Sequence, residues 1–66
     1  MHNIIALEKG EIFTGKHFKG NIRVIEVNEE SNELKVELNK EGSYWLEIWN
    51  LAHTRTGIDN GEYFKK

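Results

Sequence analysis

The segment from Asn21 to Asn39 has the pattern of a β-hairpin and constrains the fold more than any other part of the chain. In its second arm, residues 33–39, apolar and polar side chains alternate strictly, which is typical of a strand with one buried face. The polar residues 28–32 between the two arms predict a solvated turn.

The first arm of this hairpin, residues 22–27, is rich in β-branched side chains that pack well on a pleated surface. Its alternation changes phase between Val24 and Ile25. A strand that is apolar in both phases is either covered on both faces or carries a bulge where the phase changes. Both alternatives are compatible with the sequence.

The length of the chain, 66 residues, leaves room for one domain, which we place at 1–66. A domain of this size has a thin core, and disulfides, a metal or a partner chain often supply the missing stability. Because the chain has no Cys, disulfides and thiolate zinc sites are excluded. A partner chain therefore remains, and we expect a protein partner or self-association, for example as a homodimer.

The sequence indicates a soluble cytoplasmic protein. It has neither the pattern of a secretory signal at its start nor an apolar segment of membrane-spanning length. The formal net charge of −2 argues against a protein that coats DNA and against a strongly acidic mimic of DNA.

Short segments on either side of the hairpin complete the predicted topology. They are a strand at 4–7, a turn at 9–11, a strand beginning at 12–13, a turn at 39–43 with Gly42 at positive φ, a turn at 59–61 and an edge strand at 62–64.

Residues 44–49 fit two patterns. As a strand, they present Tyr44, Leu46 and Ile48 on one face and Trp45, Glu47 and Trp49 on the other. As a helix from Ser43, they align Trp45, Ile48, Trp49 and Ala52 in one stripe. The aromatic content and the preceding antiparallel pair favour the strand. Asn50 would then cap a short helix at 51–56 that Gly57 ends.

The residues Gly10-Glu11-Ile12-Phe13-Thr14-Gly15 and Gly20-Asn21-Ile22-Arg23-Val24-Ile25-Glu26-Val27 resemble the opening of small SH3-like barrels of the KOW type. The resemblance covers about a quarter of the chain. It implies a mainly β fold, a small SH3-like barrel of about five short antiparallel strands, to which the pattern adds one short helix near the carboxyl end.

The carboxyl-terminal residues also resemble the ends of small bacterial proteins of no known activity, some of them carried on phage or conjugative elements. The resemblance lies in Trp49-Asn50-Leu51, Thr54, Gly57 and Gly61-Glu62-Tyr63. It implies a bacterial source and brings no function with it.

The sequence contains no pattern of a catalytic, metal or cofactor site. His2, His17 and His53 lie far apart, and a zinc site needs three or four converging ligands. No serine has a nucleophile-elbow pattern around it, and no glycine-rich phosphate loop occurs. We therefore expect a protein that is not an enzyme and holds no cofactor.

The aromatic group Tyr44, Trp45 and Trp49 is the main candidate for a binding surface. The simpler interpretation is that both tryptophans are core residues packed under the helix. If the segment is a strand, the helix covers only part of the face with Trp45, Glu47 and Trp49. Exposed Trp and Tyr dominate protein-binding hot spots, so we predict a non-enzymatic interaction module with these three aromatic residues as anchors. An unpaired edge strand would be a second surface.

The alternative function is binding of single-stranded nucleic acid by a small barrel through the basic loop at 16–23. Its residues would be Lys16, His17, Phe18, Lys19 and Arg23. The cationic side chains would contact the phosphates of the nucleic acid, and Phe18 or His17 would stack on a base. The simpler interpretation is a solvated loop whose Phe18 folds back as an anchor.

Overall fold

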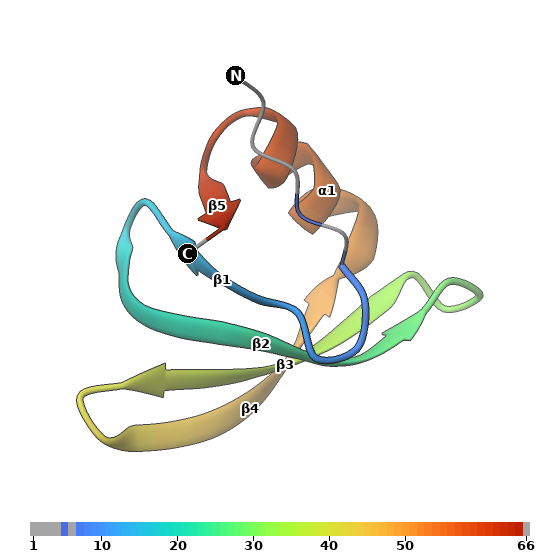
Figure 1. Ribbon diagram of the computed structural model, residues 1–66. Coiled ribbons are helices and arrows are strands. Elements are labelled where there is room, and N and C mark those ends of the chain that lie inside the picture. The colour runs from blue at the N-terminus through green and yellow to red at the C-terminus, as the bar shows by residue number, and fades with distance from the viewer. Residues whose placement is uncertain (1–4, 6, 66) are drawn as a thin grey trace.

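The computed structural model describes residues 5 and 7–65 and forms one antiparallel sheet of five strands with one short helix (Figure 1). The elements in chain order are β1 (Ile12–Gly15), β2 (Phe18–Asn28), β3 (Glu33–Lys40), β4 (Ser43–Asn50), α1 (Leu51–Asp59) and β5 (Tyr63–Lys65). Their order across the sheet is β4-β3-β2-β1-β5. The prediction of a mainly β fold with five antiparallel strands and one helix near the carboxyl end is confirmed.

The predicted hairpin is formed by β2 and β3, whose pairing begins at Asn21 opposite Asn39. The register shifts between Val24 and Glu26, so the phase change in the sequence marks a β-bulge. The extra residue at the bulge returns Val27 to the same face as Val24, and both side chains pack in or against the core. Of the two alternatives for this strand, the bulge is therefore the one that the structure contains.

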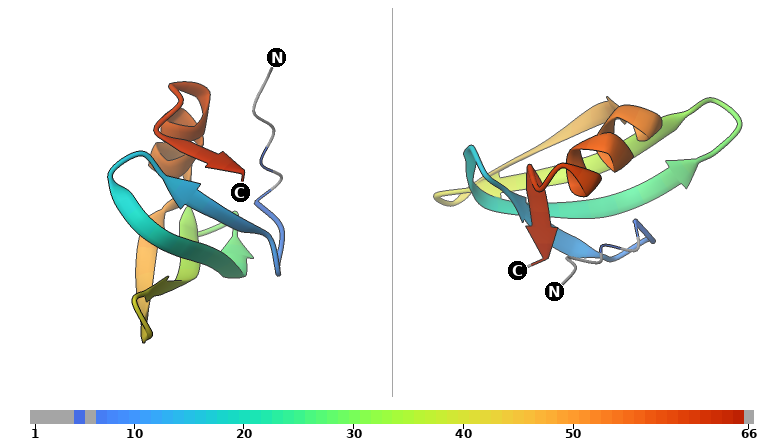
Figure 2. Two further views of the ribbon diagram at one scale, coloured as in Figure 1. Left: turned by 60° about the vertical axis from the view of Figure 1, so that its left-hand side comes forward. Right: turned by 90° about the horizontal axis from the view of Figure 1, so that it is seen from above.

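The core lies on one face of the sheet, and α1 covers part of that face (Figure 2, right). Its buried apolar residues are Leu7, Phe13, Ile22, Val24, Leu34, Val36, Leu38 and Leu51. The alternation predicted for the second arm of the hairpin is confirmed, because Leu34, Val36 and Leu38 all point into this core. The β3–β4 turn extends away from α1 (Figure 1).

Helix α1 begins as predicted and ends later than predicted. The Asn50 side chain accepts a hydrogen bond from the His53 amide at 2.8 Å, which is the expected N-cap. The predicted end at Gly57 is wrong, because the helix continues to Asp59 and Gly61, at φ 82°, supplies the positive φ that follows it. Gly57 is buried against the ring of Tyr63, so its role is close packing.

Ile5 and Leu7 are not in a strand, so the predicted strand at 4–7 is wrong for these two residues, and residues 4 and 6 lie outside the described part. Leu7 packs in the core with φ 49°. The predicted last strand is confirmed, since β5 pairs with β1 at the sheet edge, one residue later than expected. In the described part of the chain, no helix combines the length and apolar character that crossing a membrane requires.

Candidate protein-binding surface on strand β4

Strand β4 is extended and lies at one edge of the sheet. It pairs with β3 over its full length, from Lys40 opposite Ser43 to Glu33 opposite Asn50, with no register shift. The two-residue loop between them has positive φ at both Glu41 and Gly42, which is the type I′ turn that matches the twist of a hairpin. The strand alternative for residues 44–49 is thereby confirmed, and so is positive φ at Gly42.

The outer face of β4 carries three exposed apolar side chains. Tyr44, Leu46 and Ile48 have exposed fractions of 66%, 56% and 58%. Across from them on β3 lie Asn39, Glu37 and Lys35. We call Tyr44, Leu46 and Ile48 the β4 stripe. A row of large apolar side chains this exposed is unusual in so small a domain and indicates a contact surface.

The core-side face of β4 carries both tryptophans. The Trp49 ring lies 5.6 Å from that of Tyr63 and packs against the core, while Trp45 meets Phe18 edge-on at 6.1 Å. Trp45 remains 37% exposed at the rim. The three predicted anchors therefore occupy two faces, with Tyr44 outside and Trp45 and Trp49 on the core side.

Sequence reasoning did not single out Leu46 and Ile48, although the signal was present. The turn at 41–42 fixes the pairing of the two strands, and in the preceding strand the apolar face is the one with Leu34 and Val36. Pairing places Glu47 opposite Val36, and hence both tryptophans on the core side. The β4 stripe then must face outward.

Glu47 joins the two tryptophans at the rim of the core-side face. Its carboxylate accepts one hydrogen bond from Trp45 Nε1 at 2.8 Å and another from Trp49 Nε1 at 2.7 Å. These bonds, that from Trp49 first and then that from Trp45, hold the pKa of Glu47 below its usual value of 4.5. The carboxylate thereby fixes the orientation of both indoles.

This arrangement predicts that the N–H groups of both indoles report the titration of the Glu47 carboxylate. Because the pKa of Glu47 is lower in the folded state, its ionised form stabilises the fold above the unfolded value of about 4.5, and this contribution is lost as the pH falls through the folded pKa. In NMR spectra, both indole N–H resonances should shift with one common midpoint below pH 4.5. In the Glu47→Gln variant this common titration should be absent. Two indole N–H resonances that shift with different pH midpoints in the native protein would contradict the shared carboxylate.

Between the β4 stripe and β1, the outer face of the sheet is polar. Arg23 on β2 and Glu37 on β3 form an ion pair at 2.9 Å, in the same cross-strand row as Leu46 and Ile12. Ile12 is 46% exposed but is separated from the β4 stripe by this pair. The apolar surface on β4 is therefore one strand wide.

The residues of the alternative nucleic-acid site lie on the β1–β2 turn and on β2, and two of them are engaged within the chain. Lys16 and His17 make the tight turn between β1 and β2 and are exposed, as is Lys19. The predicted loop at 16–23 is wrong beyond this turn, because β2 begins at Phe18. Phe18 is half-buried and packs on Trp45, and Arg23 is engaged by Glu37 on the outer face. Three of the five residues thus remain available on the turn and the start of β2.

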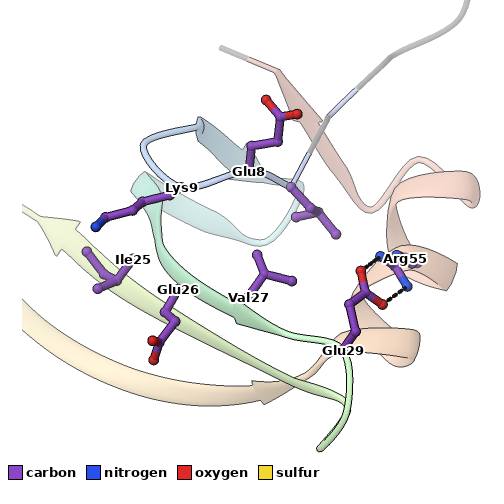
Figure 3. A pocket seen from close by; sticks show the side chains of 8 residues that line it. Glu8, Lys9, Ile25, Glu26, Val27, Glu29 and Arg55 are labelled. Atoms are coloured by element: carbon purple, nitrogen blue, oxygen red, sulfur yellow. Dashed lines mark hydrogen bonds and ion pairs between the residues drawn. The ribbon is translucent and has the colours of Figure 1, made fainter.

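A hollow of about 620 Å³ lies between the amino-terminal segment, β2 and α1 (Figure 3). Its lining residues are Leu7, Glu8, Lys9, Ile25, Glu26, Val27, Glu29 and Arg55. Arg55 closes one side by donating two hydrogen bonds to the Glu29 carboxylate, at 3.4 Å to Oε1 and 2.8 Å to Oε2. These bonds lower the pKa of Glu29. Both partners are well exposed, so this pair contributes little to stability. The charges in the hollow are of mixed sign and favour no particular ligand.

Among the described residues, no three His, Asp or Glu side chains converge in a way that could hold a metal ion. His17 lies on the turn before β2 and His53 in the first turn of α1, whereas His2 lies outside the described residues.

In comparisons with known proteins, no family model, no curated protein and no solved structure matches the chain.

Proposed function

We propose that this protein is a non-enzymatic interaction module that binds a protein chain through β4. The observation that carries the proposal is the β4 stripe, three large apolar side chains more than half exposed on an edge strand. Tyr44 is the aromatic anchor of this surface, and Trp45, partly exposed at the rim, extends it towards the other face. Trp49 supports the strand from the core side.

The energetics favour a partner that uses the strand edge as well as the side chains. Fully burying a Leu or Ile side chain contributes roughly 1.5–3 kcal/mol, and association costs on the order of 4–15 kcal/mol in lost freedom. Because the three side chains are already partly buried, they gain less than this full value and leave little surplus over the cost of association. Backbone hydrogen bonds along the edge, at about 0.5–1.5 kcal/mol each, would supply the remainder.

As parts of the same proposal, we assign the architecture to the SH3-like barrels and the protein to the bacterial cytoplasm. The first is supported by five antiparallel strands in which β5 returns to pair with β1 after a short helix. A bacterial source is supported by the resemblance of the carboxyl-terminal residues to small bacterial proteins, and a cytoplasmic setting by the absence of Cys from the sequence.

Site-specific photo-crosslinking tests the proposed surface. A benzoyl-phenylalanine in place of Leu46, irradiated in a bacterial lysate, should form covalent adducts with a protein chain, either a copy of this protein or another one. The same probe in place of Glu30, in the exposed β2–β3 turn, is the control. Adducts that are absent at both positions, or equal at both, would refute a binding surface on β4.

Nucleic-acid binding has less support, because Phe18 and Arg23 are engaged within the chain. A labelled single-stranded oligonucleotide at low salt distinguishes the two functions. Binding that is lost when Lys16 and Lys19 are both replaced by alanine would favour the nucleic-acid function over protein binding.

A further inference from the structure

We propose that the partner of β4 is a second copy of the same chain, paired antiparallel edge to edge about a two-fold axis with Leu46 opposite Leu46. This inference rests on the proposed function, since it names the occupant of the same surface. It is carried by three features of β4: its unpaired backbone groups, the register that these groups permit, and the side chains that this register brings together.

The first feature is the direction of the backbone groups. The β-turn at 41–42 joins Lys40 and Ser43 by hydrogen bonds, and in an antiparallel pair such residues alternate with residues that make none. The bond from the Leu51 amide to the Asn32 carbonyl, 2.9 Å long at the other end of the hairpin, fits the same alternation. It follows that the N–H and C=O groups of the β4 stripe point away from β3. Among the described residues, no strand pairs with this side of β4.

The second feature is the register. Pairing through the outward groups requires that Tyr44, Leu46 and Ile48 of one copy lie opposite residues of the same set in the other. With Leu46 opposite Leu46, Tyr44 of each copy lies opposite Ile48 of the other. Residues 43–49 of one copy then pair with residues 49–43 of the other. All three residues of each stripe then use their outward backbone groups.

The neighbouring registers fit less well. Centring the pair on Trp45 places Ile48 opposite Gly42, a turn residue at positive φ, so Ile48 has no strand residue to pair with. Moving the axis to Glu47 places the two Glu47 carboxylates directly opposite each other, which like charges disfavour. It also uses Asn50, whose carbonyl already accepts a bond from Thr54 inside the helix. Centring the pair on Ile48 would extend the pairing to residue 52, which is helical.

The third feature is the match of side chains. In the proposed register the two β4 stripes lie side by side and form one apolar band on the outer face, bounded on each side by the polar residues of β3. On the core side, Glu47 of one copy lies opposite Trp45 of the other. A partner laid flat over the outer face would instead cover Lys35 and the Arg23–Glu37 ion pair. The polarity of the sheet therefore favours addition at the edge.

The two edges of the sheet also differ in how they are protected. Edge strands that stay unpaired are commonly short or carry Lys, Pro or a bulge. The other edge, β5, has three residues and includes Lys65. β4 has eight residues in regular pairing with none of these features, and its one charge, Glu47, is on the core side.

Disulfide crosslinking tests the register, and the Cys-free chain provides a clean background. In the proposed dimer the Leu46 Cα atoms are about 5.5 Å apart, within disulfide range, whereas those of the two Ile48 residues are more than about 13 Å apart. The Leu46→Cys variant should oxidise to a covalent dimer at least tenfold faster than Ile48→Cys and Glu30→Cys. A mixture of Tyr44→Cys and Ile48→Cys chains, tagged to differ in size, should give the mixed dimer. Equal rates for Leu46→Cys and Glu30→Cys, or a faster Ile48→Cys, would overturn the proposal.

Sedimentation under native conditions gives an independent measurement. The unmodified protein should show a concentration-dependent dimer, and Leu46→Lys should lose it. Ile12→Lys, an exposed apolar residue on the same face but on β1, should leave the dimer unchanged. A monomer at all concentrations would refute self-pairing. The photo-crosslinking probe at position 46 distinguishes the two proposals. If it captures another protein in the lysate while the purified chain stays monomeric, the proposed function stands and only the assignment of a second copy as the partner is wrong.

Discussion

Replacing Gly20 with alanine is expected to destabilise the protein by about 3 kcal/mol, the upper end for an overpacked site. A Cβ at this position would collide with the backbone carbonyl oxygen of Asn39 on β3 and lie 2.9 Å from the Phe18 ring. The ring could turn aside, but the carbonyl belongs to the neighbouring strand and can move only if β2 and β3 separate. A domain of this size has a free energy of unfolding of roughly 3–10 kcal/mol, so a large part of the stability would be lost.

Gly15→Ala is the matched control for this substitution. Gly15 is likewise a strand glycine and is buried, whereas Gly20 is half-buried, but the atoms nearest to the Gly15 Cβ would lie at 3.4 Å, which is ordinary contact. Urea unfolding followed by tryptophan fluorescence should give a much lower midpoint for Gly20→Ala than for Gly15→Ala. Equal midpoints would show that β2 can shift at Gly20 without cost.

Gly57→Ala is expected to destabilise the protein by about 1–3 kcal/mol, although alanine in a helix interior usually stabilises by about 1 kcal/mol relative to glycine. The added Cβ would lie 2.6 Å from Cε2 and 2.9 Å from Cδ2 of the Tyr63 ring. That ring is held between Phe13, at 5.7 Å edge-on, and Trp49. It therefore cannot move aside without disturbing the core.

A double-mutant cycle with Tyr63→Ala separates this collision from helix propensity. If the ring is the obstacle, Gly57→Ala should destabilise the native chain but stabilise the Tyr63→Ala chain, and thermal or urea unfolding measures both differences. The same sign in both backgrounds would show that the contact between Gly57 and Tyr63 does not limit packing.

Much of the fold could be predicted from the sequence, because its signals are local. Strict alternation identified β3, the phase change located the bulge in β2, and Asn50 marked the start of α1. The predicted end of α1 was wrong, because a glycine late in a helical segment usually indicates the end of the helix. Its actual role depends on Tyr63, whose ring packs against it in the folded structure.

The candidate site was predicted only in part. The sequence favoured a strand over a helix at 44–49, indicated the two faces of that strand and pointed to Tyr44, Trp45 and Trp49 together. It did not single out Leu46 and Ile48, which with Tyr44 form the exposed row.

By itself, then, the sequence determined the central hairpin, the turn at 41–42 and where the helix begins, because alternation, turn residues and caps act over a few neighbouring positions. Only the tertiary structure decided which face of β4 is exposed and that its outer edge has no partner strand among the described residues. The physical reason is that both depend on pairing between strands. The neighbour β3 fixes which side of β4 meets the core, and the last strand, β5, pairs with β1 rather than with β4.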